Sequence, residues 1–97
     1  MPSYLTLANW TDQGIRDVKD LPERVEAVNE AAREAGGRLV FFYMTMGQYD
    51  MAVLLELPDD DAAAKLALTI GGRGNVRGTT LKAFTEDETR GIIAALP

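Results

Sequence analysis

The feature that most constrains the fold is an apolar stretch from Leu39 to Leu57, which is expected to form two strands joined at Gly47. The first of these strands, Arg38–Met46, is apolar on both faces and rich in the β-branched and aromatic residues that favour strands. In a chain of 97 residues, the chain's own helices can cover only one of those faces. A second copy of the chain is the obvious cover for the other face, so the sequence predicts a homodimer or higher oligomer.

Composition limits the classes of function that remain. The length matches one domain over residues 1–97, and a hydrophobic content of 46% is enough for a core. The net charge of −5, from 15 acidic and 10 basic residues, argues against nucleic acid or an anionic membrane as a partner. The start of the chain, Met1–Leu7, has no basic segment, and no apolar run approaches the roughly 18 residues that cross a bilayer. We therefore expect a cytoplasmic protein.

The chain has no Cys and no His, which removes disulfides, thiolate ligands and the commonest general base. Catalysis, if there is any, must use carboxylates, Tyr, Lys or Arg. No spacing of Asp and Glu suggests a metal site, and no motif suggests a cofactor, so neither is expected. The acidic run Asp59–Asp61 is better explained as the start of a helix, where the helix dipole stabilises negative charge.

Local patterns give an order of elements. Ser3–Asn9 alternates polar and apolar residues, as a strand does, and apolar residues then recur at helical spacing from Ile15 to Ala35. That helix is expected to restart at Asp20–Glu23, where Asp20 can cap it, and to end at Gly36–Gly37. The remaining predicted elements are strands at Arg38–Met46 and Asp50–Leu57, a helix from Asp59 to Gly72, a strand at Val76–Phe84, and a helix opened by a capping box at Thr85–Glu88.

This order, βαββαβ followed by a helix, predicts an α+β fold of the ferredoxin-like plan. Right-handed crossovers then give a four-stranded antiparallel sheet of strand order 4-1-3-2, with both main helices on one face. Met51, Val53, Leu55 and Leu57 are expected to face those helices. The residues expected on the open face are Tyr4, Thr6, Ala8, Trp10, Phe42, Asp50, Ala52, Leu54 and Glu56.

The same topology brings three polar segments to one rim of the sheet, namely Trp10–Gln13, Gly47–Asp50 and Gly74–Arg77. The side chains that could bind a small molecule there are Trp10, Gln13, Tyr49, Asp50, Asn75 and Arg77.

Each of these candidates has two interpretations. Desolvation beside an apolar face could make Asp50 a general base, although a structural ion pair with Arg77 is the favoured interpretation. Tyr49 could donate a hydrogen bond to a ligand, or its ring could cover a neighbouring strand. Trp10 could form the wall of a pocket or anchor a protein interface. Gln13 and Asn75 could bind a ligand or tie a loop to the backbone.

Several of these segments also resemble a known family. Gly47-Gln-Tyr-Asp50 is similar to the signature of the GYD domain family, and Thr11–Gly14, Gly74–Arg77 and Ala83–Thr85 are similar to its other characteristic segments. The resemblance spans nearly the whole chain. It implies a small prokaryotic protein of the dimeric α+β barrel type and implies no particular activity.

Three functions remain open from the sequence. The favoured one is a homo-oligomer that binds a small, partly apolar metabolite on the open face of the sheet. The second is a cofactor-independent enzyme, similar to isomerases or monooxygenases, with Asp50 as its general base. The third is a purely structural assembly unit with a closed, dry interface.

Overall fold

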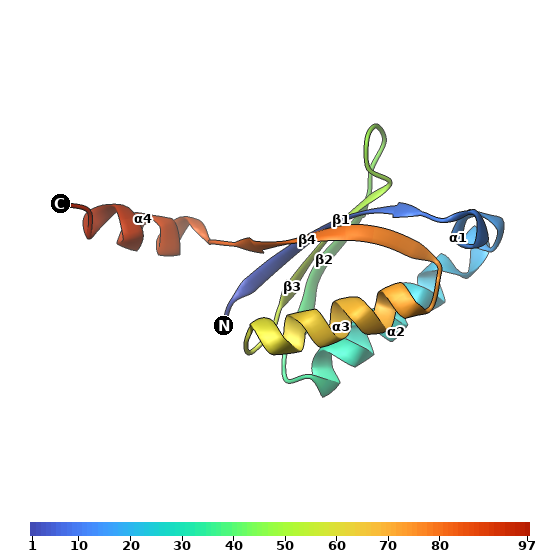
Figure 1. Cartoon of the computed structure of the whole chain (residues 1–97), viewed down its shortest axis with the longest axis horizontal. Helices are drawn as coiled ribbons and strands as arrows, with labels where there is room; N and C mark the ends of the chain where they lie inside the picture. Colours follow the sequence, from blue (N-terminus) through green and yellow to red (C-terminus); the bar gives the residue numbers. More distant parts are fainter.

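The computed structural model describes residues 1–97 and contains a four-stranded sheet with helices mainly on one side (Figure 1). The elements are β1 (Ser3–Trp10), α1 (Asp12–Arg16), the 3-10 helix η1 (Val18–Asp20), α2 (Leu21–Glu34), β2 (Arg38–Met44), β3 (Met51–Glu56), α3 (Asp60–Gly72), β4 (Val76–Ala83) and α4 (Glu86–Ala94). No helix is both long enough and apolar enough to span a bilayer.

The sheet confirms the predicted α+β architecture. Its strand order is β2-β3-β1-β4, which is the predicted order counted from the other edge, and each neighbouring pair is antiparallel. Helices α2 and α3 pack against one face, whereas α4 extends away from the sheet beyond the end of β4 (Figure 1). The opposite face of the sheet carries no helix.

The core lies between the sheet and the two packed helices. The predicted row on β3 is confirmed, because Met51, Leu55 and Leu57 are buried on the helix side. The buried cluster consists of Tyr4, Ala32, Leu55, Leu57, Ala63 and Leu66.

Tyr4 corrects the prediction for the first strand. Its side chain is only 4% exposed and its hydroxyl donates a 2.6 Å hydrogen bond to Asp60 Oδ1, at the start of α3. Tyr4 also pairs with Leu55, so both belong to the helix-facing row. Trp10 continues this row, opposite Val76, which lines the helix side of the sheet. The expectation that Tyr4, Thr6, Ala8 and Trp10 lie on the open face was therefore wrong. Alternation alone could not distinguish the two rows of β1, since both carry small or apolar residues.

Phe42 also lies on the helix side, opposite Val53, and not on the open face. An irregularity between Leu39 and Phe41 shifts the pairing of β2 with β3 by one residue. As a result Phe41 and Tyr43 share the open face, where their rings stack with centroids 4.7 Å apart.

The helix ends largely follow the predicted caps. The Asp59 side chain accepts from the Ala62 N–H at 2.8 Å, and Thr85 and Glu88 form the complete capping box of α4. The backbone N–H of Thr85, followed by its hydroxyl, lowers the pKa of Glu88. Asp20 precedes α2 as expected, but its side chain makes no capping hydrogen bond.

Candidate functional site

The three polar segments meet at one rim of the sheet, where backbone contacts hold them together. The Asp50 N–H donates to Ala8 O at 2.9 Å, joining the β2–β3 hairpin to β1. The Thr11 N–H donates to Asn75 O at 3.1 Å, joining the end of β1 to the turn before β4. Backbone hydrogen bonds thus fix both the β2–β3 hairpin and the α3–β4 turn to the end of β1.

Asp50 acts within this rim as an acceptor for the backbone. Its Oδ2 accepts from the Trp10 N–H at 3.0 Å, and its own N–H also donates to Asn9 Oδ1 at 3.0 Å. No ion pair joins Asp50 to Arg77, so the favoured interpretation of Asp50 was wrong. The reason is topological. Arg77 lies on β4, opposite Asn9 of β1, whereas Asp50 directly precedes β3 on the other side of β1. The two side chains are therefore separated by two strand spacings, roughly 9–10 Å.

Tyr49 lies in the hairpin turn beside Asp50. Its carbonyl accepts from the Thr45 hydroxyl at 2.6 Å, and the Thr45 N–H donates to Asp50 O at 2.8 Å. Gly47 adopts φ 121° in this turn, a left-handed conformation that favours glycine. These bonds fix the backbone of the hairpin and leave the Tyr49 hydroxyl without a partner in the chain.

Gln13 and Asn75 tie two loops together. Gln13 Nε2 donates to Asn75 Oδ1 at 3.0 Å and to Arg73 O at 3.2 Å. The Thr11 hydroxyl donates to Gly74 O at 2.6 Å. The contacts of both amides are therefore those of a link between α1 and the α3–β4 turn.

Trp10 is half-buried at the end of β1, opposite Val76. Its Nε1 is buried and has no hydrogen-bond partner in the chain. A buried donor is usually paired, so the Trp10 Nε1–H is a donor that the fold of one chain does not use.

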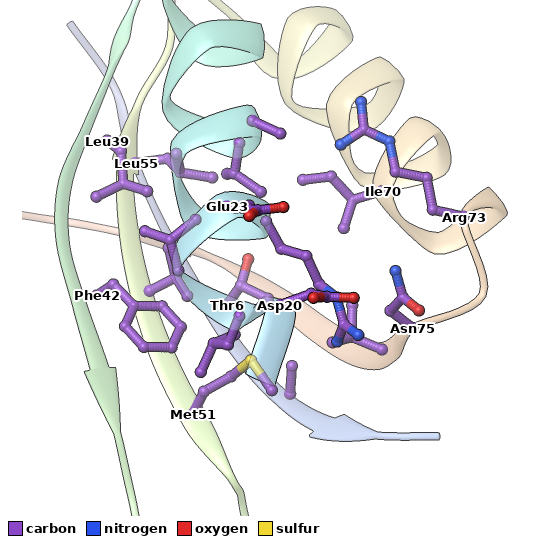
Figure 2. A pocket seen from close by; sticks show the side chains of 18 residues that line it. Thr6, Asp20, Glu23, Leu39, Phe42, Met51, Leu55, Ile70, Arg73 and Asn75 are labelled. Atoms are coloured by element: carbon purple, nitrogen blue, oxygen red, sulfur yellow. The ribbon is translucent and has the colours of Figure 1, made fainter. Parts of the chain in front are cut away.

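A cavity lies elsewhere, between the sheet and the helices. It has a volume of about 390 Å³, opens partly to solvent, and is lined by β1, β2 and β3, by the start of α2, by the end of α3 and by the start of β4. Figure 2 shows Leu39, Phe42, Met51 and Leu55 forming the wall on the β2–β3 side. Asp20, Glu23, Arg73 and Asn75 approach it from the helix ends and the α3–β4 turn.

The sequence analysis did not foresee this cavity, and of the six candidate residues only Asn75 lines it. The available signal was the small size of Thr6 and Ala8, which lie in the helix-facing row of β1. Small residues in such a row leave a cavity only if the helices do not pack directly against them. The distance between the helices and the sheet cannot be read from the sequence. No group of three or more Asp and Glu side chains is placed to hold a metal ion.

Comparisons with known proteins agree with this architecture. The model of the GYD domain family matches residues 4–93. The chain is 36% identical, over 85 residues, to a protein of Thermus thermophilus named "Glutamine synthetase and cystathionine beta-lyase binding protein", covering 87% of this chain and 90% of that protein. The crystal structure of TTHA0845 from Thermus thermophilus is similar with a TM-score of 0.55 and 25% identity, covering 88% of this chain and 95% of that one. Since the family match extends over nearly all of the chain, this protein belongs to the GYD domain family.

Proposed function

We propose that this protein is a non-catalytic binding module that works as a homo-oligomer, with two copies joined through the open face of the sheet. The observation that carries the proposal is an apolar stripe across all four strands. The registers place Phe41 opposite Leu54, Leu54 opposite Leu5, and Leu5 opposite Leu81. No part of the same chain covers this stripe, and contiguous exposed apolar surface of this kind marks interfaces.

The C-terminal segment supports the same proposal. Every residue from Phe84 to Pro97 is exposed, and α4 stands clear of the sheet (Figure 1). The apolar side chains Ile92, Ile93 and Leu96 are 49%, 60% and 64% exposed. Isolated helices shorter than about 12–15 residues are marginal in water, so a nine-residue helix with apolar side chains needs a surface to pack on. In the proposed oligomer, the α4 arm of each copy packs on the other copy.

A small, partly apolar metabolite would be held between the joined faces. Arg77 shares the open face with the stripe and forms no ion pair within the chain, which leaves its guanidinium available to a polar group of such a molecule. Tyr49 would lie at the edge of this space, near the rim.

A second candidate function is docking on another protein, such as a metabolic enzyme. It is favoured by the relative that is named as a binding protein for two enzymes. The β2–β3 hairpin offers a surface for it, because Tyr43 and Met44 are exposed and Met46 is 95% exposed. Flexible Met-rich surfaces adapt to protein partners.

The geometry gives less support to an enzyme that uses Asp50 as a general base. The Asp50 carboxylate accepts a hydrogen bond from a backbone N–H and does not line the cavity between the sheet and the helices. A general base must lie within hydrogen-bond reach of the proton that it removes.

A pair of variants tests the self-association. Leu81→Asp places a charge on the stripe at a side chain that is already 44% exposed, so folding should be retained. Leu68→Asp is the matched control, because Leu68 is 76% exposed on α3, on the other side of the sheet. Sedimentation velocity should show a smaller species for Leu81→Asp alone. Unchanged sedimentation of both variants would overturn the proposed interface.

The docking candidate has its own test. The purified chain is mixed with the glutamine synthetase or the cystathionine β-lyase of the organism that encodes this chain. The mixture is then analysed by size-exclusion chromatography. Co-elution that is lost in Met46→Ser and kept in Leu68→Ser would support docking through the hairpin. If the chain co-elutes with neither enzyme, these two enzymes are excluded as partners.

A further inference from the structure

We propose that the cavity between the sheet and the helices is a binding site for a free amino acid with a large apolar side chain. The apolar side chain would occupy the interior, and the ammonium and carboxylate groups would meet the charged rim. This site is on the opposite side of the sheet from the stripe, so the proposal does not depend on self-association.

The size and lining of the cavity are those of a small-molecule site. Its volume of about 390 Å³ falls within the roughly 300–1,000 Å³ of typical ligand pockets. Twelve of its eighteen lining residues are hydrophobic. Such a space would hold on the order of a dozen waters at about 30 Å³ each, but an apolar wall offers them few hydrogen bonds. An organic molecule is therefore a better occupant than water.

The floor of the cavity offers little to a polar ligand. Thr6 is the polar residue of the β1 floor, and its hydroxyl lies 3.0 Å from the Thr80 hydroxyl, with which it shares a hydrogen bond. Ala8 beside it has no polar side chain. The β2–β3 wall is formed by Leu39, Phe42 and Met51 (Figure 2). The interior thus suits a branched aliphatic or aromatic group.

The rim carries free charges of both signs. Helices α2 and α3 are antiparallel, so the first turn of α2 and the last turn of α3 lie at the same end of the molecule (Figure 1). Asp20 and Glu23 come from the start of α2, and Arg73 follows α3, which are the helix ends that each charge prefers. None of the three side chains forms an ion pair or a hydrogen bond within the chain.

Arg24 also lines the cavity, but its guanidinium is already used. Its Nη1 donates to Gly14 O at 3.1 Å and its Nη2 donates to Asp17 O at 2.6 Å. Arg73 is therefore the guanidinium that remains free for a ligand carboxylate, which a guanidinium can bind through two parallel hydrogen bonds. Asp20 and Glu23 remain free for an ammonium group.

Only a molecule with both charges and an apolar group uses every part of this site. A hydrocarbon would contact the apolar wall and leave the charged residues of the rim without a partner. An organic acid would pair with Arg73 but be repelled by Asp20 and Glu23, and an amine would pair with the two carboxylates but be repelled by Arg73. An amino acid with a small side chain would leave the interior empty. These differences make the proposal testable with a matched set of compounds.

The test is a calorimetric or NMR titration of the full chain with L-phenylalanine and L-leucine. The matched compounds are phenethylamine, which lacks the carboxylate, 3-phenylpropanoate, which lacks the ammonium group, and L-alanine, which lacks the apolar group. We expect the first two to bind and the other three to bind at least about tenfold more weakly, because each of them lacks either a charge-assisted hydrogen bond or the apolar contact. Equal binding of all the aromatic compounds, or no binding of L-phenylalanine, would overturn the proposal.

Variants locate the binding on the protein. Arg73→Gln and Glu23→Gln should each weaken L-phenylalanine binding about tenfold, whereas Arg33→Gln and Glu26→Gln, exposed residues of α2 that do not line the cavity, should not. Ala27→Trp should abolish binding, because Ala27 is an exposed lining residue whose enlargement fills the cavity without disturbing the core. Binding by Arg73→Gln or folded Ala27→Trp at the wild-type level would contradict the proposal. Leu81→Asp should keep its binding, which separates this proposal from self-association.

Discussion

At the scale of single residues, Gly14 has the tightest requirement in the rim. It is buried in α1, and a Cβ added to it would lie 1.9 Å from Asn75 O, a backbone atom that already accepts from the Thr11 N–H. We predict that Gly14→Ala lowers the free energy of unfolding by about 2 kcal/mol, the usual cost of forcing extra volume into a packed site. Urea denaturation measures this change.

The control for Gly14 is another helical glycine, Gly71, around which a Cβ would meet nothing within 4 Å. Gly71→Ala should leave stability unchanged or raise it by up to about 1 kcal/mol, because alanine favours the helix more than glycine does. Equal effects of the two substitutions would show that contact with Asn75 is not the reason Gly14 is required.

Tyr4 and Asp60 predict how stability depends on pH. The hydrogen bond to Asp60, followed by burial, raises the pKa of Tyr4 to about 12, and the same bond, followed by Lys82 at 3.2 Å, lowers the pKa of Asp60. The folded protein therefore favours protonated Tyr4 and ionised Asp60. Stability should fall as pH rises from about 10 to 12, and should also fall as pH drops through about 4 and below.

The measurement is the melting temperature as a function of pH for the wild type and for Tyr4→Phe. The variant should melt lower at neutral pH, and the difference should shrink at both extremes because the hydrogen bond then contributes less in the wild type. A constant difference across the pH range would mean that Tyr4 and Asp60 are not coupled.

These residue contacts also show where sequence reasoning reached its limit. The convergence of Trp10, Asp50 and Asn75 at one rim follows from topology and could be predicted. The partner of Asp50 could not, because it is the backbone of Trp10, and any residue type except proline provides a backbone N–H. The side of the sheet on which Tyr4 lies depends on the register of β1. That register is not specified by a strand in which polar and apolar residues alternate only weakly.

At the scale of elements, the α4 arm is the part whose position the rest of the chain does not explain. Its capping box specifies a helix, and Ile92 and Ile93 give that helix an apolar side. We predict that the double substitution Ile92→Ser and Ile93→Ser raises the dissociation constant of the proposed dimer at least about tenfold, since burying such a side chain contributes about 1.5–3 kcal/mol. Sedimentation equilibrium measures the constant.

The arm variant should keep the stability of the sheet, because α4 does not pack on it in the same chain. Leu68→Ser serves as the control for a lost apolar side chain at an exposed helical position. If the double variant and the control have the same dissociation constant, the arm is not part of the interface.

Most elements could be predicted because each has its own local signal. Alternation identified β1, glycines ended the helices, and Thr85 with Glu88 marked the start of α4. The irregularity between Leu39 and Phe41 had no such signal, since Val40 is as apolar as its neighbours and either register is compatible with the pattern. That single shift decided which aromatic residues of β2 face the helices.

At the scale of the whole molecule, the sheet separates two features of different character. One side has the cavity with its charged rim, and the other has the stripe formed by Phe41, Leu54, Leu5 and Leu81. The stripe could be inferred from composition and topology, whereas the cavity depends on how closely the helices approach Thr6 and Ala8.

The central claim is that one copy of this chain leaves an apolar face and an apolar arm that only a second copy covers. Light scattering coupled to size-exclusion chromatography of the unmodified chain tests it most directly, because the mass of one copy is 10.6 kDa. We predict a mass of at least two copies that persists on dilution into the micromolar range. A mass of one copy, with α4 still helical and Leu81 still accessible to solvent, would contradict the account.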